Sequence, residues 1–326
     1  METSGFVGID ISKDTFDASY EPSAEHMVFA NNAKGFKLFG RWVMDRTRSP
    51  FVVMEHTGIY SYQLEQYLHL KHMPFCKVAA VKIKKSSGLV RGKSDMADSL
   101  MIARYGADKR RELTARKPDQ PTIVRLKNLI SLRDKMVADK AGYVGRLKEQ
   151  QACLGLGAGD ILVKAQKGII KDFEERIAVL EREIGRTIDA DEAARINYSL
   201  LISIKGVGKV LASYMIAFTE NFTAFDTPRQ FACYSGIAPF PDESGKLKKR
   251  TRVSQYGYKK LKSLLHLSAM VSVQYCPDIK AYYERRTQMG KNKMSTLNVV
   301  RNKIVARMFA VIKRKSVYEA TWLSAA

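Results

Sequence analysis

The order of apolar patterns in the first 106 residues limits the possible folds more than any other feature of this chain. Strand-like runs alternate there with stretches that carry apolar residues at helical spacing. The apolar residues of a strand-like run are either continuous or follow a period of two. A helix that Asn31 or Asn32 caps is predicted after the third run. The runs are 6–11, 15–20, 26–30, 51–55 and 75–81, with helical positions at Phe36, Phe39 and Val43 and at Leu64, Tyr67 and Leu68. This order, which begins with a three-stranded meander, predicts an α/β domain over residues 1–106.

The pattern changes beyond this domain, and residues 107–195 are predicted to be helical. A helical stripe comes first, and a glycine-rich break at 155–159 separates it from a second stripe. In the second stripe the apolar residues alternate spacings of three and four, which is a heptad pattern. The first stripe holds Ile123, Leu126, Ile130 and Val137, and the second holds Ile170, Phe173, Ile177, Leu180 and Ile184. Two heptads fit a helix pair in a bundle as well as an intermolecular coiled coil, so dimerisation through this stripe is a hypothesis.

Residues 196–326 are predicted to be mainly helical, with one polar, basic loop at 239–258. The segment Ser203–Lys209 has the sequence Ser-Ile-Lys-Gly-Val-Gly-Lys and resembles the hairpin of a helix-hairpin-helix. Glycines in such a hairpin let backbone N–H groups approach a phosphate. A plain turn between two helices explains the same string equally well.

The charge balance indicates the class of partner. The chain holds 55 Lys and Arg against 33 Asp and Glu, a net charge of +22, which favours phosphate-rich polymers or anionic surfaces. No stretch approaches the ~18 apolar residues of a membrane-spanning helix, and the first residues show no secretory signal. The cysteines form no closely spaced pair and are predicted to be reduced; they are Cys76, Cys153, Cys233 and Cys276. We therefore expect a cytoplasmic, nucleoid-associated protein that binds a polyanion and no membrane.

Four acidic residues of the first domain are candidates for metal binding. Asp10 and Glu55 each stand at the end of an apolar strand, where a carboxylate is costly unless it is paired or binds a cation. Asp95 and Asp98 open a helix with Leu100, Met101 and Ala103 predicted on its buried side, and their spacing places both on one face. Together the four acids predict a two-metal phosphoryl-transfer site. Taken singly, they could equally be a turn residue, an ion-pair partner and a carboxylate at a helix N-terminus.

Two basic segments are candidates for nucleic-acid binding. From Lys246 to Lys262 the chain has eight Lys or Arg and no acid, with tyrosines between them. A second basic run leads into Asp95 and could feed a nucleic acid to the metals; it comprises Lys77, Lys82, Lys84, Lys85, Arg91 and Lys93. A merely solvated basic face is the alternative. In the loop the candidate nucleophiles are Ser244, Ser254, Tyr256 and Tyr258, among which spacing does not choose, and no histidine base is close in sequence.

Five strings spread over the chain resemble the DEDD-type insertion-sequence transposases, RNA-guided bridge recombinases whose relatives include pilin-gene invertases. They are Gly8–Lys13, Glu55–Tyr60, Lys93–Asp98, Ser203–Gly208 and Phe231–Pro239, the last running into Glu243-Ser244-Gly245. They occur in the order of the family pattern. One departure is that the stretch after Gly245 is richer in lysine than that pattern.

The resemblance implies an RNase H-like (RuvC-like) N-terminal domain, a helical coiled-coil middle and a mainly helical C-terminal transposase domain with a helix-hairpin-helix-like segment. It implies a metal site of Asp10, Glu55, Asp95 and Asp98 for Mg²⁺, with Mn²⁺ as an alternative, and a nucleophilic Ser244 that forms a phosphoserine intermediate with DNA. It further implies donor and target DNA and a structured non-coding guide RNA as partners. The protein would be a homodimer, and a tetramer in its active complex, with acids and serine supplied by different protomers.

The predicted nucleic-acid contacts are Lys82, Lys84, Lys85, Arg91, Lys93, Lys205, Lys209, Lys246, Lys248, Lys249, Arg250 and Arg252. Two other functions use the same residues differently. A RuvC-like structure-selective nuclease would use the four acids and a water molecule without Ser244. A non-catalytic RNA- or DNA-binding protein would need neither the acids nor the serine. Ser244→Ala separates these readings, because only the transposase needs the hydroxyl.

Overall fold

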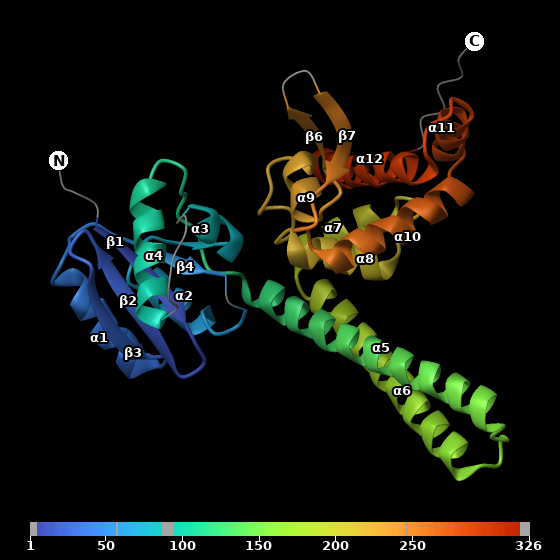
Figure 1. Cartoon of the computed structure of the whole chain (residues 1–326), viewed down its shortest axis with the longest axis horizontal. Helices are drawn as coiled ribbons and strands as arrows, with labels where there is room; N and C mark the ends of the chain where they lie inside the picture. Colours follow the sequence, from blue (N-terminus) through green and yellow to red (C-terminus); the bar gives the residue numbers. More distant parts are fainter. Residues whose placement is uncertain (1–4, 57, 87–93, 245–246, 320–326) are drawn as a thin grey trace. The chain divides into compact units, whose positions relative to one another are not determined.

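The computed structural model divides the chain into two compact units, Met1–Pro118 and Asp119–Ala326, which are described separately (Figure 1). It describes residues 5–56, 58–86, 94–244 and 247–319, and of residues 241–244 and 247–252 the backbone only. The division into domains at 106 and 195 stays a prediction.

Unit 1 is built on a five-stranded sheet of order β3-β2-β1-β4-β5. Strand β2 is antiparallel to both neighbours, whereas β1 is parallel to β4 and β4 to β5. This confirms an α/β region that begins with a meander. The strands are β1 (Gly5–Ile11), β2 (Thr15–Glu21), β3 (Glu25–Ala30), β4 (Pro50–Glu55) and β5 (Phe75–Val78), and the helices are α1 (Ala33–Met44), α2 (Tyr62–Leu70), α3 (Ala80–Ser86) and α4 (Asp95–Asp108).

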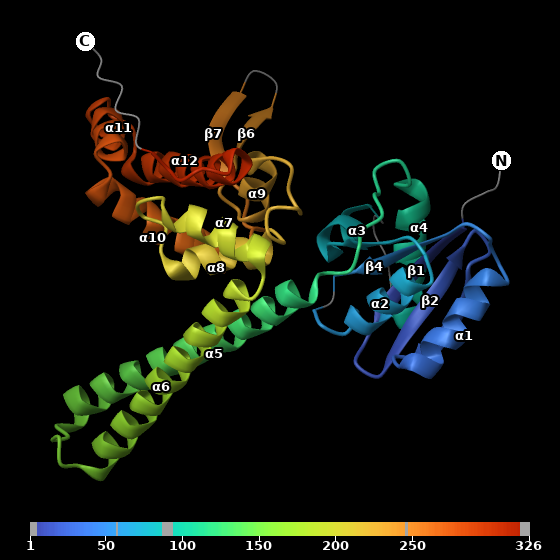
Figure 2. The ribbon, with the colours of Figure 1, turned by 180° about the vertical axis from the view of Figure 1, so that it is seen from behind.

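Helices cover both faces of this sheet, as the two opposite views show (Figures 1 and 2). On one face α1 and α2 bury an aromatic-rich core against β1 and β4, in which Phe16, Phe29 and Phe39 pack ring to ring. On the other face α3 and α4 contribute Ile83 and Ile102 to a smaller core. Asn32, one of the two predicted caps, accepts hydrogen bonds from the backbone N–H groups of Lys34 and Gly35 at the start of α1.

Two predictions for this unit are wrong in detail. The strand predicted to reach Val81 ends at Val78, and α3 begins at Ala80, because the apolar run continues with helical spacing to a buried Ile83. On α4 the buried side carries Ser99, Ile102 and Ala103, whereas Leu100 and Met101 are half-buried. Ser99, Ala103 and Gly106 on this side are small, which lets the helix approach the strands closely.

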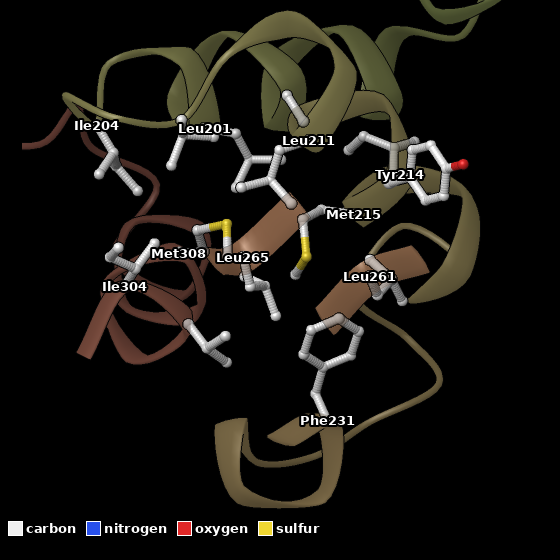
Figure 3. Packing of buried hydrophobic residues seen from close by; sticks show 14 of the residues in the cluster. Leu201, Ile204, Leu211, Tyr214, Met215, Phe231, Leu261, Leu265, Ile304 and Met308 are labelled. Atoms are coloured by element: carbon white, nitrogen blue, oxygen red, sulfur yellow. The ribbon is translucent and has the colours of Figure 1, made fainter. Parts of the chain in front are cut away.

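Unit 2 is mainly helical, as predicted. Its helices are α5 (Pro121–Leu154), α6 (Ile161–Asp189), α7 (Glu192–Ile202), α8 (Lys209–Phe218), α9 (Pro228–Tyr234), α10 (Lys259–Tyr275), α11 (Pro277–Gln288) and α12 (Lys293–Arg314). One core joins α7–α12 with the first turns of α5 and the end of α6, around fully buried residues such as Tyr214, Phe231 and Leu265 (Figure 3).

Helices α5 and α6 lie side by side as an antiparallel pair (Figures 1 and 2). The predicted heptad stripe of α6 faces α5, with Ile177 and Ile184 buried and the other three positions half-buried. Ion pairs cross between the helices, Arg133 to Glu181 at 2.7 Å and Lys140 to Glu174 at 3.3 Å. The stripe therefore pairs within the chain, which accounts for its pattern.

The loop predicted at 239–258 is in large part a β-hairpin. Strands β6 (Pro239–Ser244) and β7 (Leu247–Val253) pair antiparallel, with Ser244 opposite Leu247. Two prolines and many lysines concealed this, because both residue types are depleted in strands. The dipeptide Gly245-Lys246 between the strands, a frequent signature of tight hairpins, is the signal that could have predicted it.

No helix in the described part of the chain has both the length and the apolar character that crossing a membrane requires. The four cysteines are free thiols.

Candidate functional site

Asp10 and Glu55 stand on neighbouring parallel strands. Ile9 pairs with Met54, so the next residue of each strand lies at the same level, at the carboxyl ends of β1 and β4. Successive side chains of a strand point to opposite faces. Asp10 therefore shares the face of Gly8, which is the face that α4 covers.

Helix α4 brings the other two acids to the same place. A Cβ atom on Gly8 would lie 2.1 Å from the backbone nitrogen of Ala103, and one on Gly106 would lie 2.9 Å from the ring of Phe6. Because Ala103 lies near Gly8 and Gly106 near Phe6, α4 runs antiparallel to β1. Its first turn, which carries Asp95 and Asp98, therefore lies at the carboxyl end of β1.

A buried hydrogen bond fixes this docking. The hydroxyl oxygens of Ser19 on β2 and Ser99 on α4 lie 2.7 Å apart. The start of α4 is capped by Ser94, whose hydroxyl accepts from the backbone N–H of Ala97 at 3.2 Å. The position of the acidic turn is thus set by both the cap and the sheet.

The electrostatics of Asp10 show that the acids act on one another. Its pKa is raised from 3.8 to about 6, first because the carboxyl is half-buried and loses part of its hydration. Neighbouring negative charges raise it further, in the order Asp98, Glu55, Asp95 and Asp17. The other three predicted acids thus lie close enough to Asp10 for their charges to raise its pKa.

The donor chemistry of this acidic cluster fits a hard divalent cation. Mg²⁺ prefers oxygen ligands and usually takes a few carboxylates together with water or phosphate oxygens. Among the residues that the structure describes, no three His, Cys, Asp or Glu side chains are close enough to hold a metal ion as they stand. Carboxylates that repel one another do not close into a coordination shell by themselves. The fit therefore rests on the donor types and on the raised pKa of Asp10.

Sequence reasoning missed Asp17, a fifth acid at this site. It lies directly opposite Asp10 in the β1–β2 pairing, and its Oδ1 lies 2.7 Å from Nε2 of His26 on β3. The period-two alternation of β2, which places Asp17 and Ser19 on the same face, was the available signal.

Asn31 also contributes to this site, although the sequence indicates it only as a helix cap. Its amide donates to the carbonyl oxygens of Ser12 at 3.0 Å and of Tyr60 at 3.2 Å. Ser12 follows the strand of Asp10, and Tyr60 follows the strand of Glu55. Asn31 therefore links the two segments that succeed the acidic strand ends.

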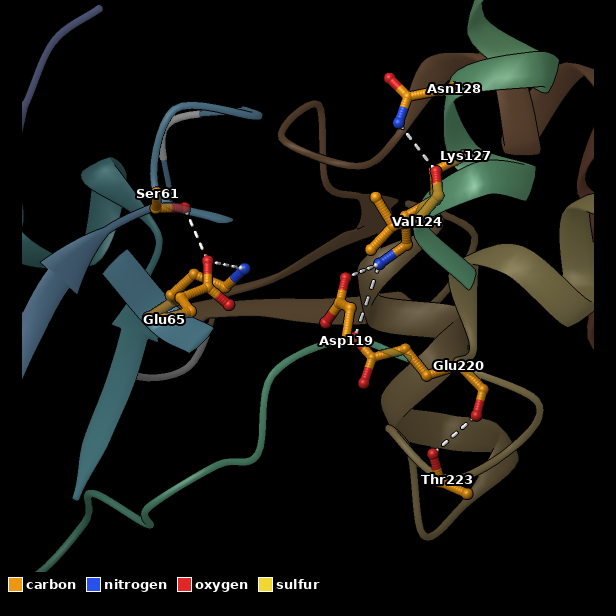
Figure 4. A network of polar contacts seen from close by, with 9 residues as sticks. Ser61, Glu65, Asp119, Val124, Lys127, Asn128, Glu220 and Thr223 are labelled. Atoms are coloured by element: carbon orange, nitrogen blue, oxygen red, sulfur yellow. Dashed lines mark hydrogen bonds and ion pairs between the residues drawn. The ribbon is translucent and has the colours of Figure 1, made fainter. Parts of the chain in front are cut away.

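One predicted member of the basic run is structural. The side chain of Lys77 is only 8% exposed, and its Nζ donates to Glu65 Oε1 at 2.9 Å. The Ser61 hydroxyl donates to the same oxygen at 2.7 Å (Figure 4). Lys77, the first residue of the basic run, is therefore the ion-pair partner of a buried carboxylate. Lys82, Lys84 and Lys85 are exposed on α3, as the prediction requires. Arg91 and Lys93 lie outside the described residues.

The candidate nucleophiles differ in their surroundings. The Ser254 hydroxyl accepts from the backbone N–H of Tyr256 at 3.1 Å and so closes a turn. Tyr258 packs 4.9 Å from the ring of Phe218, and burial raises the pKa of its phenol. Both features reduce nucleophilicity, which leaves Ser244, whose backbone ends β6, and Tyr256, whose side chain is 75% exposed.

The predicted hairpin at 203–208 joins α7 to α8. Gly206 has φ +95°, and its carbonyl accepts from the Ser268 hydroxyl of α10 at 2.7 Å, so the turn is fixed on that helix. Lys205 and Lys209 on its two sides are exposed. Lys248, Lys249, Arg250 and Arg252 lie on β7, where the structure describes their backbone, and Lys246 lies outside the described residues.

Comparison with known families matches both units. The model of the IS116/IS110/IS902 transposase family matches residues 198–284, and a second transposase model, of the DEDD type of IS110, matches residues 7–151. The second match contains all four predicted acids.

Individual proteins similar to this chain include gene-inverting proteins and a transposase. The pilin gene-inverting proteins of Moraxella lacunata and Moraxella bovis are each 27% identical over 325 residues, covering 96% of this chain and 97% of theirs. A probable family 20 transposase of Pseudomonas aeruginosa is 30% identical over 161 residues, which is 48% of this chain and 46% of that protein. The similarity to the Moraxella proteins thus spans both units.

Proposed function

This chain belongs to the IS116/IS110/IS902 family of transposases, enzymes of DNA recombination, and we propose that it cleaves and rejoins DNA through a phosphoserine intermediate on Ser244. The observation that carries the proposal is the convergence of Asp10, Glu55, Asp95 and Asp98 from two strand ends and one helix, together with the raised pKa of Asp10. Such a cluster suits phosphoryl transfer.

We assign unit 1 to the RNase H-like (RuvC-like) architecture. The sheet order β3-β2-β1-β4-β5, with β2 alone antiparallel, supports this assignment. So do the acids at the ends of the two central parallel strands. In the same way, the heptad stripe and the cross-helix ion pairs support a coiled coil for α5 and α6.

In the proposed reaction the Ser244 hydroxyl oxygen attacks the scissile phosphorus, a phosphoserine ester forms, and one DNA strand leaves as a free hydroxyl end. Asp10, Glu55, Asp95 and Asp98 would hold Mg²⁺ or Mn²⁺, which supplies positive charge against the charge developing on the phosphate. Exposed lysines on α3 and beside the 203–208 turn would bind the DNA backbone.

The proposed partners are donor DNA, target DNA and a structured guide RNA. Base pairing with RNA would read sequence, while the protein contributes charge and shape, which a net charge of +22 supports. The proposed assembly is a homodimer that forms a tetramer on DNA. Purification without nuclease treatment, followed by sequencing of bound RNA, tests the guide: a defined non-coding RNA is expected, and random cellular RNA would contradict it.

The decisive experiment compares Ser244→Ala with the wild type on a nicked or phosphorothiolate DNA substrate. The wild type should form an adduct that survives denaturation, and mapping should place it on Ser244. Loss of the adduct with metal binding intact supports the transposase mechanism. Unaffected cleavage by the variant would instead indicate water attack by a RuvC-like nuclease, and an adduct on Tyr256 would replace the serine by that tyrosine.

A further inference from the structure

The backbone entering the β6–β7 hairpin is held by side-chain amides of α12. The carbonyl oxygen of Ile237, which shortly precedes β6, accepts hydrogen bonds from Asn298 Nδ2 at 2.9 Å and from Asn302 Nδ2 at 3.1 Å. Ile237 is fully buried, and so is Ala238 beside it. Two amide donors on one buried carbonyl define the position of this backbone closely.

A third residue fixes which way the Asn298 amide faces. Arg301 is only 6% exposed, and its Nη1 lies 3.4 Å from Asn298 Oδ1. Its other terminal nitrogen, Nη2, lies 2.6 Å from His266 Nδ1 on α10. A guanidinium only donates, so Nδ1 of His266 accepts, and burial and the charge of Arg301 lower the pKa of this ring. Because a guanidinium only donates, Asn298 must present its oxygen to Arg301 and its NH₂ group to Ile237.

Both ends of the hairpin are tied down at its base. On the entering side, Arg229 Nη2 donates to the carbonyl of Pro239 at 2.9 Å. On the leaving side, the backbone N–H of Tyr258 donates to the carbonyl of Tyr234 at 3.0 Å. Gly236 and Gly257 meet there so closely that a Cβ on Gly257 would lie 2.2 Å from Gly236 Cα.

We infer that Asn298 and Asn302 are positioning residues, which hold the Ile237 carbonyl and thereby aim the hairpin that carries Ser244. The inference rests on the proposed function, since it assumes that Ser244 reacts. A displacement of about 1 Å at reacting atoms can cost on the order of 100-fold in rate. A hairpin pivoting at its base moves its tip by more than its base, so a small loosening at Ile237 is amplified at Ser244.

Asn298→Asp tests the inference sharply. The substitution replaces the donor to Ile237 by a carboxylate oxygen, which repels the carbonyl oxygen, and it places the other oxygen beside the buried guanidinium of Arg301, which strengthens that contact. Because the two effects oppose each other, we expect a Tm near that of the wild type, unchanged affinity for DNA, and a rate of adduct formation at saturating DNA that falls roughly 10- to 100-fold. A purely structural asparagine would instead lose rate only in proportion to lost folded protein.

A matched control is Asn128→Asp on α5. Asn128 also donates its amide to a backbone carbonyl, that of Val124 at 2.8 Å, and the change of charge is the same (Figure 4). The control should form the adduct at the wild-type rate. Asn302→Ala serves as the second variant, since it leaves the Arg301–Asn298 contact in place, and it should slow adduct formation without weakening DNA binding.

Ser244→Ala is run in parallel to separate the two proposals. If it still forms the adduct, the proposed function fails. If it abolishes the adduct while Asn298→Asp and Asn302→Ala react at the wild-type rate, the positioning inference alone is overturned. If Asn298→Asp lowers the Tm, the rate of adduct formation by Asn302→Ala tests the inference instead: a slower rate supports it, and the wild-type rate overturns it.

Discussion

At the scale of the residue, the raised pKa of Asp10 predicts a pH-dependent cost to folding. Its pKa is about 6 in the folded chain against 3.8 in the unfolded reference, so between these values the folded state binds more protons. Stability from this group therefore falls as pH rises from about 4 to 6 and stays lower above it. In EDTA, Asp10→Asn should melt at a higher temperature than the wild type at pH 7 by roughly 2–4 °C, about 1 kcal/mol after discounting solvent screening of a half-exposed group.

The same measurement at pH 4 is the internal control. Both proteins carry a neutral side chain at this position there, so their Tm values should converge. A difference of equal size at both pH values would mean that the substitution acts through packing and not through charge.

The acids also predict how each variant responds to metal. Asp10→Ala, Glu55→Ala, Asp95→Ala and Asp98→Ala should each abolish strand transfer while the chain stays folded, since each removes a proposed ligand. Mg²⁺ should raise the Tm of the wild type, because a ligand that binds only the folded state stabilises it. The four variants should gain less, and equal gains in all five proteins would show that these residues do not bind the metal.

The site residues that the sequence predicts are those with a recognisable local pattern. Asp10, Glu55, Asp95 and Asp98 could be proposed because strand ends and a helix start are visible in one segment each. Asp17 and Asn31 were not found as site residues, since their roles depend on cross-strand pairing and on contacts to Tyr60, far along the chain. The ion pair of Lys77 could not be predicted for the same reason, because its partner Glu65 lies on another element.

At the scale of the element, Gly8 allows α4 to dock on β1. A Cβ there would lie 2.1–2.2 Å from backbone atoms of Ala103 and Ser99, and backbone cannot move as a flexible side chain can. Gly8→Ala should destabilise unit 1 by about 1–3 kcal/mol or more through overpacking, and should displace Asp95 and Asp98 from Asp10. Chemical denaturation measures the first effect, and the loss of Mg²⁺-induced stabilisation measures the second.

Gly145→Ala on α5 is the matched comparison. Nothing lies within 4 Å of a Cβ at this helical position, so the substitution should be neutral or stabilise by about 0.5–1 kcal/mol. If both variants lost the same stability, the close packing of α4 on β1 would not be the cause.

The five strands of unit 1 and the helices α1, α2, α4, α5 and α6 followed from the sequence, whereas α3 and the β6–β7 hairpin did not. The alternation of β1 and β2 and the heptads of α6 are set by burial on one side, which the apolar pattern records. The β6–β7 hairpin has no such apolar pattern; its base is fixed by Asn298, Asn302 and Arg229 from other elements. Such tertiary contacts cannot be seen in a local window of sequence.

At the scale of the whole molecule, the net charge of +22 predicts nucleic-acid binding that weakens steeply with salt. Each phosphate neutralised on duplex DNA contributes about −0.9 to the slope of log K against log salt, so about five contacts give a slope of about −4.5. Replacing the exposed Lys205 and Lys209 by Gln should make the slope shallower by roughly 1 each. Binding that barely changes between low and moderate salt would remove this argument.

The two-unit architecture makes a last prediction about assembly. The acids belong to unit 1 and Ser244 to unit 2, and the proposed active complex takes them from different protomers. An Asp10→Ala protomer retains its serine and a Ser244→Ala protomer retains its acids, so a dimer of the two contains one intact combination. With free exchange half the dimers are mixed, and adduct formation should recover to roughly a quarter of the wild-type level. Each variant alone should be inactive, and a mixture that stays inactive although mass spectrometry detects mixed dimers would show that acids and serine act within one chain.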